Sequence, residues 1–338
     1  MEGCELKAEN LLEARGLTVR FAAGSAGLFG KATRFSAVDD CSLGVKEREV
    51  LSLVGESGCG KTTFGKTAIG LIKPTSGTVL YEGKDIWQLS RNEYAEFRRN
   101  AQIIHQDPYS SLHPVKKVYE IVSSGVRYHK LLPTERKIRE KSIEVLGMVG
   151  LNPPDYFMNK YPHQLSGGQR QRVSIARAVI LSPRFILADE IVTMIDVSMK
   201  IGILNLLLEL RENLGSSFLF ITHDFGVARY FAEGGRTAVM YLGNIVEVGK
   251  TDELIMDPLH PYTKALLSAV PVPDPILAKE RKMIELRRID PPDPVNPPPG
   301  CKFSDRCPFL MEGKCDVKLP ELVEAKDGRL VACYLYGS

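Results

Sequence analysis

"GESGCGKTT", Gly55–Thr63, is the stretch of the sequence that decides the fold. It follows the short apolar run "EVLSLV", which is typical of a buried parallel strand, and it opens a predicted helix. It fits the pattern G-x-x-x-x-G-K-[ST] at Gly55, Gly60, Lys61 and Thr62. Glycines let backbone N–H groups converge on phosphate oxygens, and the helix N-terminus adds a positive dipole end. A glycine-rich turn that matches by chance is the alternative, but the flanking strand and helix favour a phosphate-binding loop.

Four side chains supply the chemistry that such a loop requires. Lys61 would reach the β- and γ-phosphates of a nucleotide, and the Thr62 hydroxyl would bind Mg²⁺. Further along, the apolar run "FILADE" ends in Asp189 and Glu190. Asp189 can hold Mg²⁺ through water, and Glu190 can polarise the attacking water. Two solvated acids at the end of a strand are the alternative, but the phosphate loop in the same chain favours a hydrolytic site.

A second anion-binding end is predicted in "LSGGQRQRVSIARA", Leu165–Ala178. Ser166 is placed to cap a helix, and its hydroxyl and the N–H groups of Gly167 and Gly168 would face an anion. The alternative is an ordinary capped helix. The presence of a phosphate loop in the same chain favours anion binding.

The remaining pattern predicts a parallel α/β sheet with a helical insertion. The helix after the phosphate loop is expected to stop at Pro74 and Gly77, and residues Val115–Ala178 look helical. Within the insertion Thr134 is a plausible N-cap. One face of its helix holds Ile138, Val145, Leu146 and Val149. Strands and helices then alternate again through "RFILAD", "IGILNLLLELREN" and "SFLFIT".

Composition narrows the class of protein. The 338 residues are 44% hydrophobic and 25% charged with a net charge of +3, which does not suggest a nucleic-acid-binding surface. We find neither a signal-peptide pattern at the start nor an uninterrupted run of 18 apolar residues, so we expect no membrane span. A proline-rich, loop-rich connector is expected from Pro258 to Gly300.

The motifs, in this order, resemble those of the ATP-binding subunits of ABC transporters. "GESGCGKTT" resembles the Walker A loop, "LSGGQ" the signature motif and "FILADE" the Walker B strand with its catalytic glutamate. "IIHQDPYSSLHP" is similar to the Q-loop region and gives Gln106, "ITHD" gives the switch histidine His223, and "MIDVS" gives the D-loop aspartate Asp196. Read without the family, Gln106 and His223 would be ordinary surface or capping residues.

The resemblance implies how these residues act. Two subunits would meet head to tail, so that the signature of one chain, Ser166–Gln169, acts on ATP held by its partner. Glu190 would be the general base or water orienter, His223 would contact the γ-phosphate, and Gln106 would touch Mg²⁺ or water. The implied Mg²⁺ site is formed by Thr62, Gln106 and Asp189. The implied ATP-binding residues are Gly55, Ser57, Gly58, Cys59, Gly60, Lys61, Thr62 and Thr63. Phe35 would stack on adenine, with Phe21 or a plain core role for Phe35 as alternatives.

The resemblance also implies the fold class and its divisions. We expect an α/β P-loop NTPase (RecA-like) core with a mixed sheet, a helical subdomain and a cysteine-containing, loop-rich extension. The core would comprise residues 1–107 and 179–250, the helical subdomain with the signature residues 108–178, and the extension residues 251–338.

Four of the seven cysteines lie in the last forty positions. Without a secretory signal, reduced thiols or a metal site are favoured over disulfides. "HPYTKALLSAVP" and "PPPGCKFSDRCPFLMEGKC" resemble the extension of the oligopeptide/dipeptide subfamily, which implies an iron–sulfur cluster on Cys301, Cys307, Cys315 and Cys333. Four thiolates suit [4Fe–4S] or structural Zn²⁺, and the absence of close C-x₂₋₄-C pairs favours the cluster. Four reduced structural thiols are the alternative.

The implied function is an ATP-hydrolysing subunit that powers an importer of oligopeptides or dipeptides at the cytoplasmic face of the cell membrane. Its partners would be a second, homologous ATPase subunit, two transmembrane permease subunits and, through them, an extracytoplasmic substrate-binding protein, with no nucleic acid. Oligosaccharides or nickel are alternative cargoes. A subunit with a weakly hydrolytic site, or an ABC ATPase of DNA repair or translation, is a further alternative.

One stretch departs from the family pattern. The family usually has Asp-Glu-Pro-x-Ser-Ala-Leu-Asp, whereas this chain has "DEIVTMID", Asp189–Asp196. Both carboxylates and Asp196 keep their spacing, and Thr193 keeps a hydroxyl. We therefore expect a competent hydrolysis site with an unusual D-loop backbone.

Overall fold

The computed structural model describes residues 10–23, 33–193, 195–270 and 284–337. The chain divides into two compact units, each described here by itself. The first unit holds the described residues up to Leu12 together with Val45–Glu49 and Tyr81–Ile221. The second holds the described residues of Glu13–Gly44, Val50–Leu80 and Thr222–Ser338. The division into core, helical subdomain and extension therefore stays a prediction.

The first unit is built on three parallel strands in the order β8–β7–β6. Their bounds are β6 Ala101–Ile104, β7 Phe185–Asp189 and β8 Ser217–Thr222. All residues of β7 and β8 are buried, and all of them except Asp189, Ser217 and Thr222 are apolar, as expected of buried parallel strands. Asp189 at the end of β7 pairs with Ile221 of β8, so the predicted carboxylates follow directly from the carboxyl end of a buried strand.

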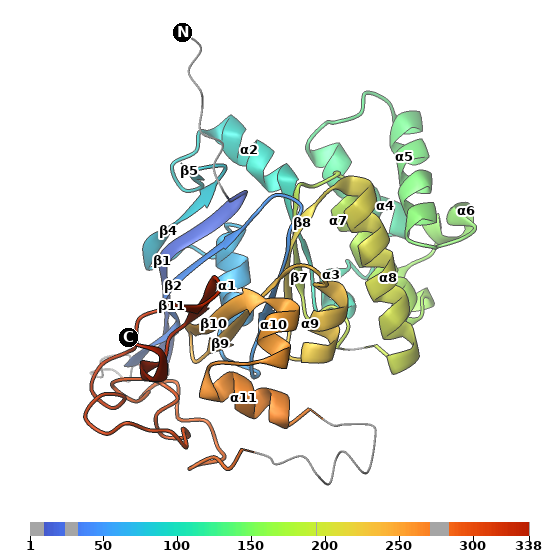
Figure 1. Cartoon of the computed structure of the whole chain (residues 1–338). Coiled ribbons are helices and arrows are strands. Elements are labelled where there is room, and N and C mark those ends of the chain that lie inside the picture. Colours follow the sequence, from blue (N-terminus) through green and yellow to red (C-terminus); the bar gives the residue numbers. More distant parts are fainter. Residues whose placement is uncertain (1–9, 24–32, 194, 271–283, 338) are drawn as a thin grey trace, which may run out of the picture. The chain divides into compact units, whose positions relative to one another are not determined.

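Helices make up most of the rest of the first unit, and Figure 1 shows α4, α5, α6 and α7 grouped together. Thr134 caps α5 by accepting a hydrogen bond from the Lys137 N–H, and the predicted apolar face is buried. The predicted helical insertion is thus confirmed. The bounds of these elements are β5 Lys84–Asp85, α2 Arg91–Asn100, α3 Pro108–Ser111, α4 Val118–Tyr128, α5 Glu135–Met148, α6 Pro154–Met158, the 3₁₀ helix η1 Pro162–Gln164, α7 Gly167–Val179 and α8 Val197–Leu214.

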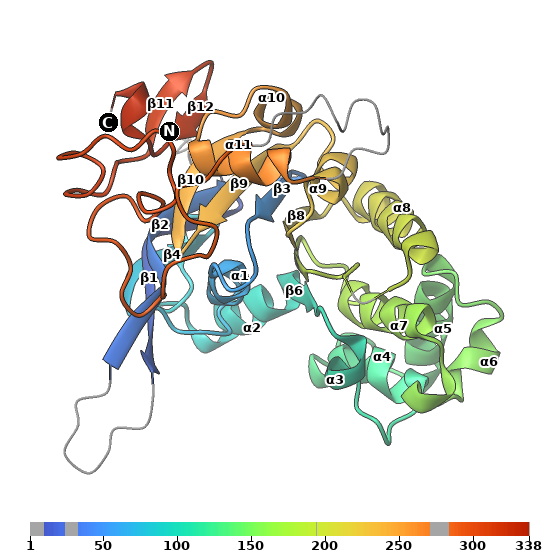
Figure 2. The ribbon, with the colours of Figure 1, turned by 90° about the horizontal axis from the view of Figure 1, so that it is seen from below.

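The second unit contains a mixed sheet. Strand β3 pairs in parallel with β9, whereas β9–β10, β10–β12 and β12–β11 are antiparallel pairs, and Figure 2 shows the last hairpin beside β10. Three further strands lie in the order β2–β1–β4. The bounds are β1 Leu12–Ala23, β2 Thr33–Val45, β3 Val50–Val54, β4 Ser76–Tyr81, β9 Arg236–Tyr241, β10 Asn244–Lys250, β11 Val323–Lys326 and β12 Arg329–Val331.

The first helix of the second unit corrects one expectation. The helix after the phosphate loop ends at Ala68 rather than near Pro74, because Gly70 takes a left-handed φ of 71°. The predicted connector from Pro258 contains one short helix, α11, and a 3₁₀ helix follows the last cysteine. The bounds are α1 Lys61–Ala68, α9 Phe225–Phe231, α10 Thr251–Met256, α11 Pro261–Ser268 and η2 Tyr334–Tyr336.

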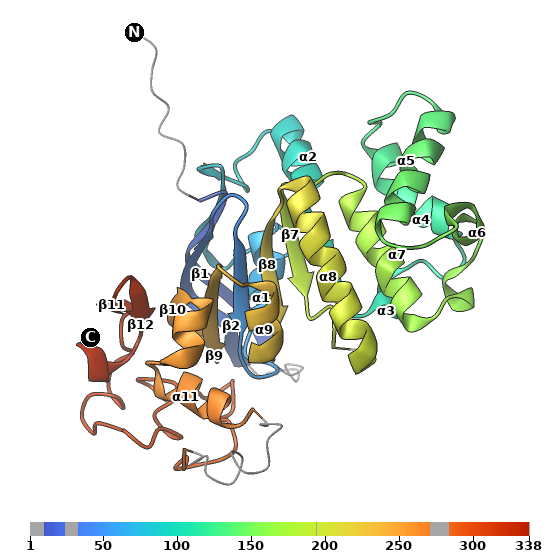
Figure 3. The ribbon, with the colours of Figure 1, turned by 45° about the vertical axis from the view of Figure 1, so that its right-hand side comes forward.

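Within the second unit, the extension packs onto the sheet through an apolar cluster. Tyr262 of α11 and Phe303 of the extension are both about fully buried, with exposed fractions of 1%, and both contact Tyr241 of β9. Figure 3 shows α11 beside the loops of the extension. Burial of these three rings joins the extension to the core sheet as one hydrophobic cluster.

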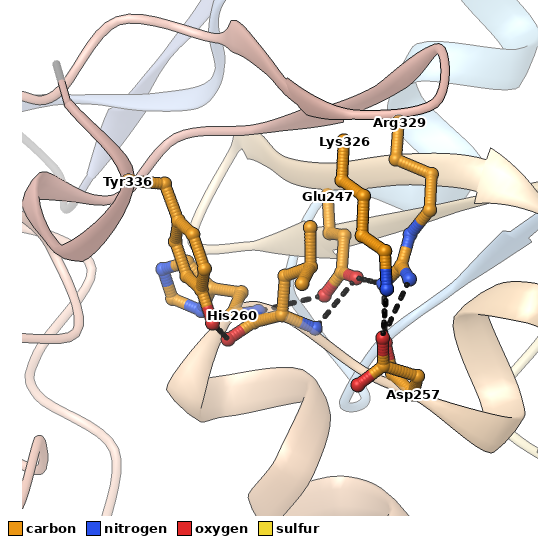
Figure 4. A network of polar contacts seen from close by, with 7 residues as sticks. Glu247, Asp257, His260, Lys326, Arg329 and Tyr336 are labelled. Carbon is orange, nitrogen blue, oxygen red and sulfur yellow. Dashed lines mark hydrogen bonds and ion pairs between the residues drawn. The ribbon is translucent and has the colours of Figure 1, made fainter.

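A buried ion pair fastens the terminal hairpin to the same sheet (Figure 4). The Arg329 guanidinium on β12 donates to the Glu247 carboxylate on β10 over 3.1 Å, with side-chain exposed fractions of 4% and 0%. Glu247 also accepts hydrogen bonds from the Leu259 and His260 N–H groups, each over 2.9 Å. These bonds satisfy a carboxylate that would otherwise be costly to bury.

Within the described ranges, none of the helices is both long and apolar enough to cross a bilayer.

Candidate functional site

The phosphate loop lies between β3 and α1 in the second unit and can be built only with glycine at its key positions. Gly60 is the N-cap of α1 and has a left-handed φ of 108°. A Cβ on Gly60 would lie 2.1 Å from the Ala37 carbonyl oxygen, and one on Gly55 would lie 2.2 Å from that of Met240. Only glycine fits at both positions, because neighbouring backbone carbonyls lie too close for a side chain. Such glycines are typical of loops that bind phosphate through backbone N–H groups.

Lys61 is held across this loop. Its ammonium donates to the carbonyl oxygens of Gly55 and Glu56, over 2.8 and 2.9 Å, and its exposed fraction is only 3%. The Cys59 sulfur lies 3.9 Å from the ammonium, yet burial raises the pKa of this thiol more than Lys61 lowers it. Cys59 is therefore a neutral packing residue, and Lys61 supplies the cationic group of the loop.

Phe35 lies beside the phosphate loop. It lines a cavity together with Gly58 and Cys59, and its ring centroid is 6.1 Å from that of Phe21. Phe35 is half-buried whereas Phe21 is exposed. The cavity gives Phe35 the position that an aromatic residue next to a bound base would need.

The two predicted carboxylates of the first unit lie at the carboxyl end of β7. Asp189 ends β7 with an exposed fraction of 3%. Glu190 has a left-handed φ of 46°, and its N–H donates to the Ile221 carbonyl over 3.0 Å. The Gln106 amide donates to the Glu190 carboxylate over 3.0 Å, so the structure brings these two predicted residues together. Strained backbone at a non-glycine residue is a common feature of functional sites.

The apolar residues after Glu190 have a simple explanation. Ile191 and Val192 are buried, with exposed fractions of 1% and 4%, and so they belong to the core. The Thr193 hydroxyl donates to the Glu190 carbonyl over 2.7 Å and closes the turn. Met194 lies outside the described residues, and Asp196 is the exposed N-cap of α8.

The signature residues form the predicted helix start. Ser166 is the N-cap of α7, and its hydroxyl and the Gln169 side chain make reciprocal hydrogen bonds with the backbone. A Cβ on Gly168 would lie 1.7 Å from the Met199 methyl group, whereas one on Gly167 would meet nothing within 4 Å. An exposed, capped helix end with open space over Gly167 can receive an anion.

His223 follows the last residue of β8 and is exposed, and the next residue, Asp224, caps α9 through its carboxylate. This places the predicted switch histidine at the carboxyl end of a strand, where side chains are available to ligands.

The four cysteines of the extension line one cavity. Burial raises the pKa of Cys301 to about 12 and that of Cys307 to about 11, and the pKa of Cys333 is raised for the same reason. The Cys301 N–H donates to the Cys315 carbonyl over 2.7 Å. Yet among the described residues no group of three or more His, Cys, Asp or Glu is arranged to hold a metal ion. The donor set suits a cluster, whereas the thiols as they stand do not form its coordination geometry.

Sequence reasoning missed the polar contacts between the extension and the phosphate loop. The Arg306 guanidinium donates to both carboxylate oxygens of Glu56, and the Tyr262 hydroxyl accepts from the Glu56 N–H. Glu56 and Arg306 are 250 positions apart, and no local pattern links them. A pair of covarying charges in an alignment would have been the signal.

Curated relatives match this chain over nearly its whole length. Residues 38–193 match the family described as "ABC transporter", and residues 246–315 match the "Oligopeptide/dipeptide transporter, C-terminal region". The putative oligopeptide transport ATP-binding protein YkfD of Bacillus subtilis (strain 168) is 44% identical over 96% of this chain and 95% of its own length. The oligopeptide transport ATP-binding protein AppF of the same organism is 44% identical over 97% and 98%.

Solved structures agree with this assignment. A dimeric ATP-binding cassette in a post-hydrolysis state, bound to ADP and Pi, is 30% identical to this chain with a TM-score of 0.62. The match covers 71% of this chain and 98% of that one. The chain therefore belongs to the ATP-binding subunits of ABC transporters, which are ATPases with a P-loop NTPase fold, and to the group with the oligopeptide/dipeptide C-terminal region.

Proposed function

We propose that this ATPase powers the import of oligopeptides or dipeptides through an ABC transporter. The observation that carries the proposal is the match of residues 246–315 to the oligopeptide/dipeptide C-terminal region, together with relatives of nearly equal length named for peptide transport. Two permease subunits and a second, homologous ATPase subunit are the partners that such a role requires. The chain would act at the cytoplasmic face of the membrane. An extracytoplasmic binding protein would deliver the cargo to the permeases.

Each predicted site residue would have one role in ATP binding or hydrolysis. Lys61 and the backbone N–H groups of the phosphate loop would bind the phosphates of ATP, and Phe35 would stack on its adenine. Glu190, oriented by Gln106, would polarise the attacking water, and His223 would hold the γ-phosphate. Mg²⁺, held by Thr62, Gln106 and Asp189, would neutralise charge on the phosphates.

The signature and the D-loop would serve the partner's nucleotide. The exposed start of α7, with Ser166, Gly167, Gly168 and Gln169, offers N–H groups to the γ-phosphate of ATP bound by the other subunit. Asp196 would lie between the two sites. Closure around ATP and reopening after hydrolysis would move the permeases between two states, because ATP binds the closed dimer more tightly.

The test is transport by the complete complex in proteoliposomes. ATP-dependent uptake of labelled di- to pentapeptides is expected, with no uptake of oligosaccharides or Ni²⁺. Uptake of an oligosaccharide or of Ni²⁺ in place of peptides would reject the peptide cargo and leave the ATPase role intact.

We further propose that Cys301, Cys307, Cys315 and Cys333 hold a [4Fe–4S] cluster, or Zn²⁺, that fastens the extension. The support is that all four thiols line one cavity. Such a group would serve as a structural clip, and its binding would require the release of thiol protons, which burial favours on Cys301, Cys307 and Cys333 by raising their pKa. Anaerobic purification followed by iron, sulfide and zinc analysis tests this. A colourless protein with zinc and no iron would reject the cluster, and a metal-free protein would reject both.

A further inference from the structure

Arg306 is positioned by a series of tight turns in the extension. The Ser304 N–H donates to the Cys301 carbonyl, the Arg306 N–H to the Phe303 carbonyl and the Cys307 N–H to the Ser304 carbonyl. The Arg306 side chain is 7% exposed. Its guanidinium lies 5.6 Å from the centre of the Phe303 ring, which is itself in the buried cluster. The turns and this packing fix the direction in which Arg306 points.

That direction is the phosphate loop. Arg306 Nη1 lies 3.1 and 3.0 Å from the two carboxylate oxygens of Glu56, and Nη2 lies 3.1 Å from Oε1. Glu56 is the second residue of the loop Gly55–Thr63. A forked, charge-assisted contact of this kind restrains both side chains.

Tyr262 of α11 holds the same loop residue by its backbone. The Tyr262 hydroxyl accepts a hydrogen bond from the Glu56 N–H over 2.9 Å. The ring is 1% exposed and lies 4.5 Å from that of Tyr241, so its position is set by the core. The carbonyl of Glu56 meanwhile accepts from the Lys61 ammonium. The side chain, N–H and carbonyl of Glu56 are thus all engaged.

We propose that Arg306 is a positioning residue for ATP binding, which acts through Glu56 to hold the phosphate loop in its binding conformation. The inference deepens the proposed function and rests on it. A loop that is already ordered loses little conformational freedom when ATP binds. The affinity of the protein for ATP is therefore higher. The segment between Cys301 and Cys307 therefore has a role in nucleotide binding, in addition to any metal or cluster that the cysteines hold.

The test compares variants of the full chain by calorimetric titration with ATP and Mg²⁺. We expect Arg306→Gln to raise the Kd of ATP about tenfold, equivalent to ~1.4 kcal/mol. Arg306→Lys should recover part of the loss, because an ammonium keeps the charge and loses the fork. Glu56→Gln should weaken binding similarly, and the double variant Arg306→Gln/Glu56→Gln should be no weaker than either single variant, since both changes break one contact.

Arg329→Met is the matched control, because the Arg329 side chain is as buried as that of Arg306, at 4% against 7% exposed, and pairs with Glu247 and Asp257 outside the loop. Below the unfolding temperature of every variant, this control should bind ATP like the unaltered chain. The proposal is overturned if Arg306→Gln binds ATP within about twofold of the unaltered chain. It is also overturned if Arg329→Met weakens binding equally, which would reveal only a loss of stability. Should Arg306→Gln not fold, Glu56→Gln and Tyr262→Phe decide by the same criterion. Failure of the unaltered chain to bind ATP would instead reject the proposed function.

Discussion

The Gln106 amide donates to the Glu190 carboxylate over 3.0 Å, although 84 positions separate the two residues. Gln106 follows strand β6 and Glu190 follows strand β7, and these strands are parallel neighbours. The sheet therefore brings the two side chains to the same edge. Glu190 adopts a left-handed backbone at this point, so the carboxylate is oriented both by its own main chain and by Gln106.

Gln106→Ala should lower the kcat of ATP hydrolysis by the complete complex by about tenfold to a hundredfold, because a misplaced catalytic group loses that much. ATP affinity should fall less than kcat, because Thr62 and Asp189 would still hold the Mg²⁺ that binds with ATP. Steady-state assays at saturating ATP measure the effect. The control is Gln88→Ala, which removes an exposed amide in the same unit. Equal kcat values in the two variants would show that the contact with Glu190 does not matter for hydrolysis.

Phe35→Ala should raise the Kd of ATP about fivefold to a hundredfold, since stacking of a base on an aromatic ring contributes ~1–3 kcal/mol. Phe21→Ala is the matched control, because Phe21 contacts Phe35 but does not line the cavity beside Gly58. Fluorescence titration with a nucleotide analogue gives both constants. A larger loss with Phe21→Ala would assign the stacking role to Phe21.

Arg329→Met should lower the free energy of unfolding by ~3–5 kcal/mol, because it leaves the buried Glu247 carboxylate without its cation. Adding Glu247→Gln should restore part of this loss. Urea unfolding followed by tyrosine fluorescence measures it. Lys326→Met removes the exposed contact with Asp257 and should cost at most ~1 kcal/mol. Similar losses in both single variants would contradict the distinction between the buried and the exposed pair.

The free energy of unfolding should decrease as the pH is lowered, because His260 is buried in its neutral form. Burial lowers the pKa of this side chain to about 3, and the charge of Lys264 adds to the effect. The folded state keeps His260 neutral while the unfolded chain protonates it near pH 6.5. Its contribution is therefore present above that pH and is lost as the pH falls from about 6.5 toward 3, with a slope of at most ~1.4 kcal/mol per pH unit.

His260→Asn isolates this effect, because asparagine can still accept the Tyr262 N–H at the start of α11 without titrating. Its free energy of unfolding should vary less between pH 6.5 and 5 than that of the unaltered chain. The exposed His113→Asn serves as the control. An identical pH dependence in His260→Asn and the unaltered chain would show that His260 is not kept neutral by folding.

Local patterns predicted most of the fold. The strand before Gly55, the cap at Ser166 and the cap at Thr134 each depend on residues close in sequence, and all three are found in the structure. The distant contacts were beyond such reasoning. No sequence pattern near Glu56 predicts its contact with Arg306, and none near Glu247 predicts its contact with Arg329. Tertiary packing alone brings these charges together. Helix α1 ends at Ala68, earlier than Pro74 predicts, because the left-handed backbone at Gly70 already terminates it.

Glu190→Gln in this chain alone, within the complete transporter complex, tests the central claim most directly. Removing the group that polarises the attacking water should lower single-turnover hydrolysis of the ATP bound by this chain by about a hundredfold or more, while ATP binding persists. Peptide uptake should fall with it, and the exposed control Glu212→Gln should retain both activities. Undiminished hydrolysis and uptake in the Glu190→Gln complex would contradict the account, because this chain would then only bind ATP while its partner hydrolyses it.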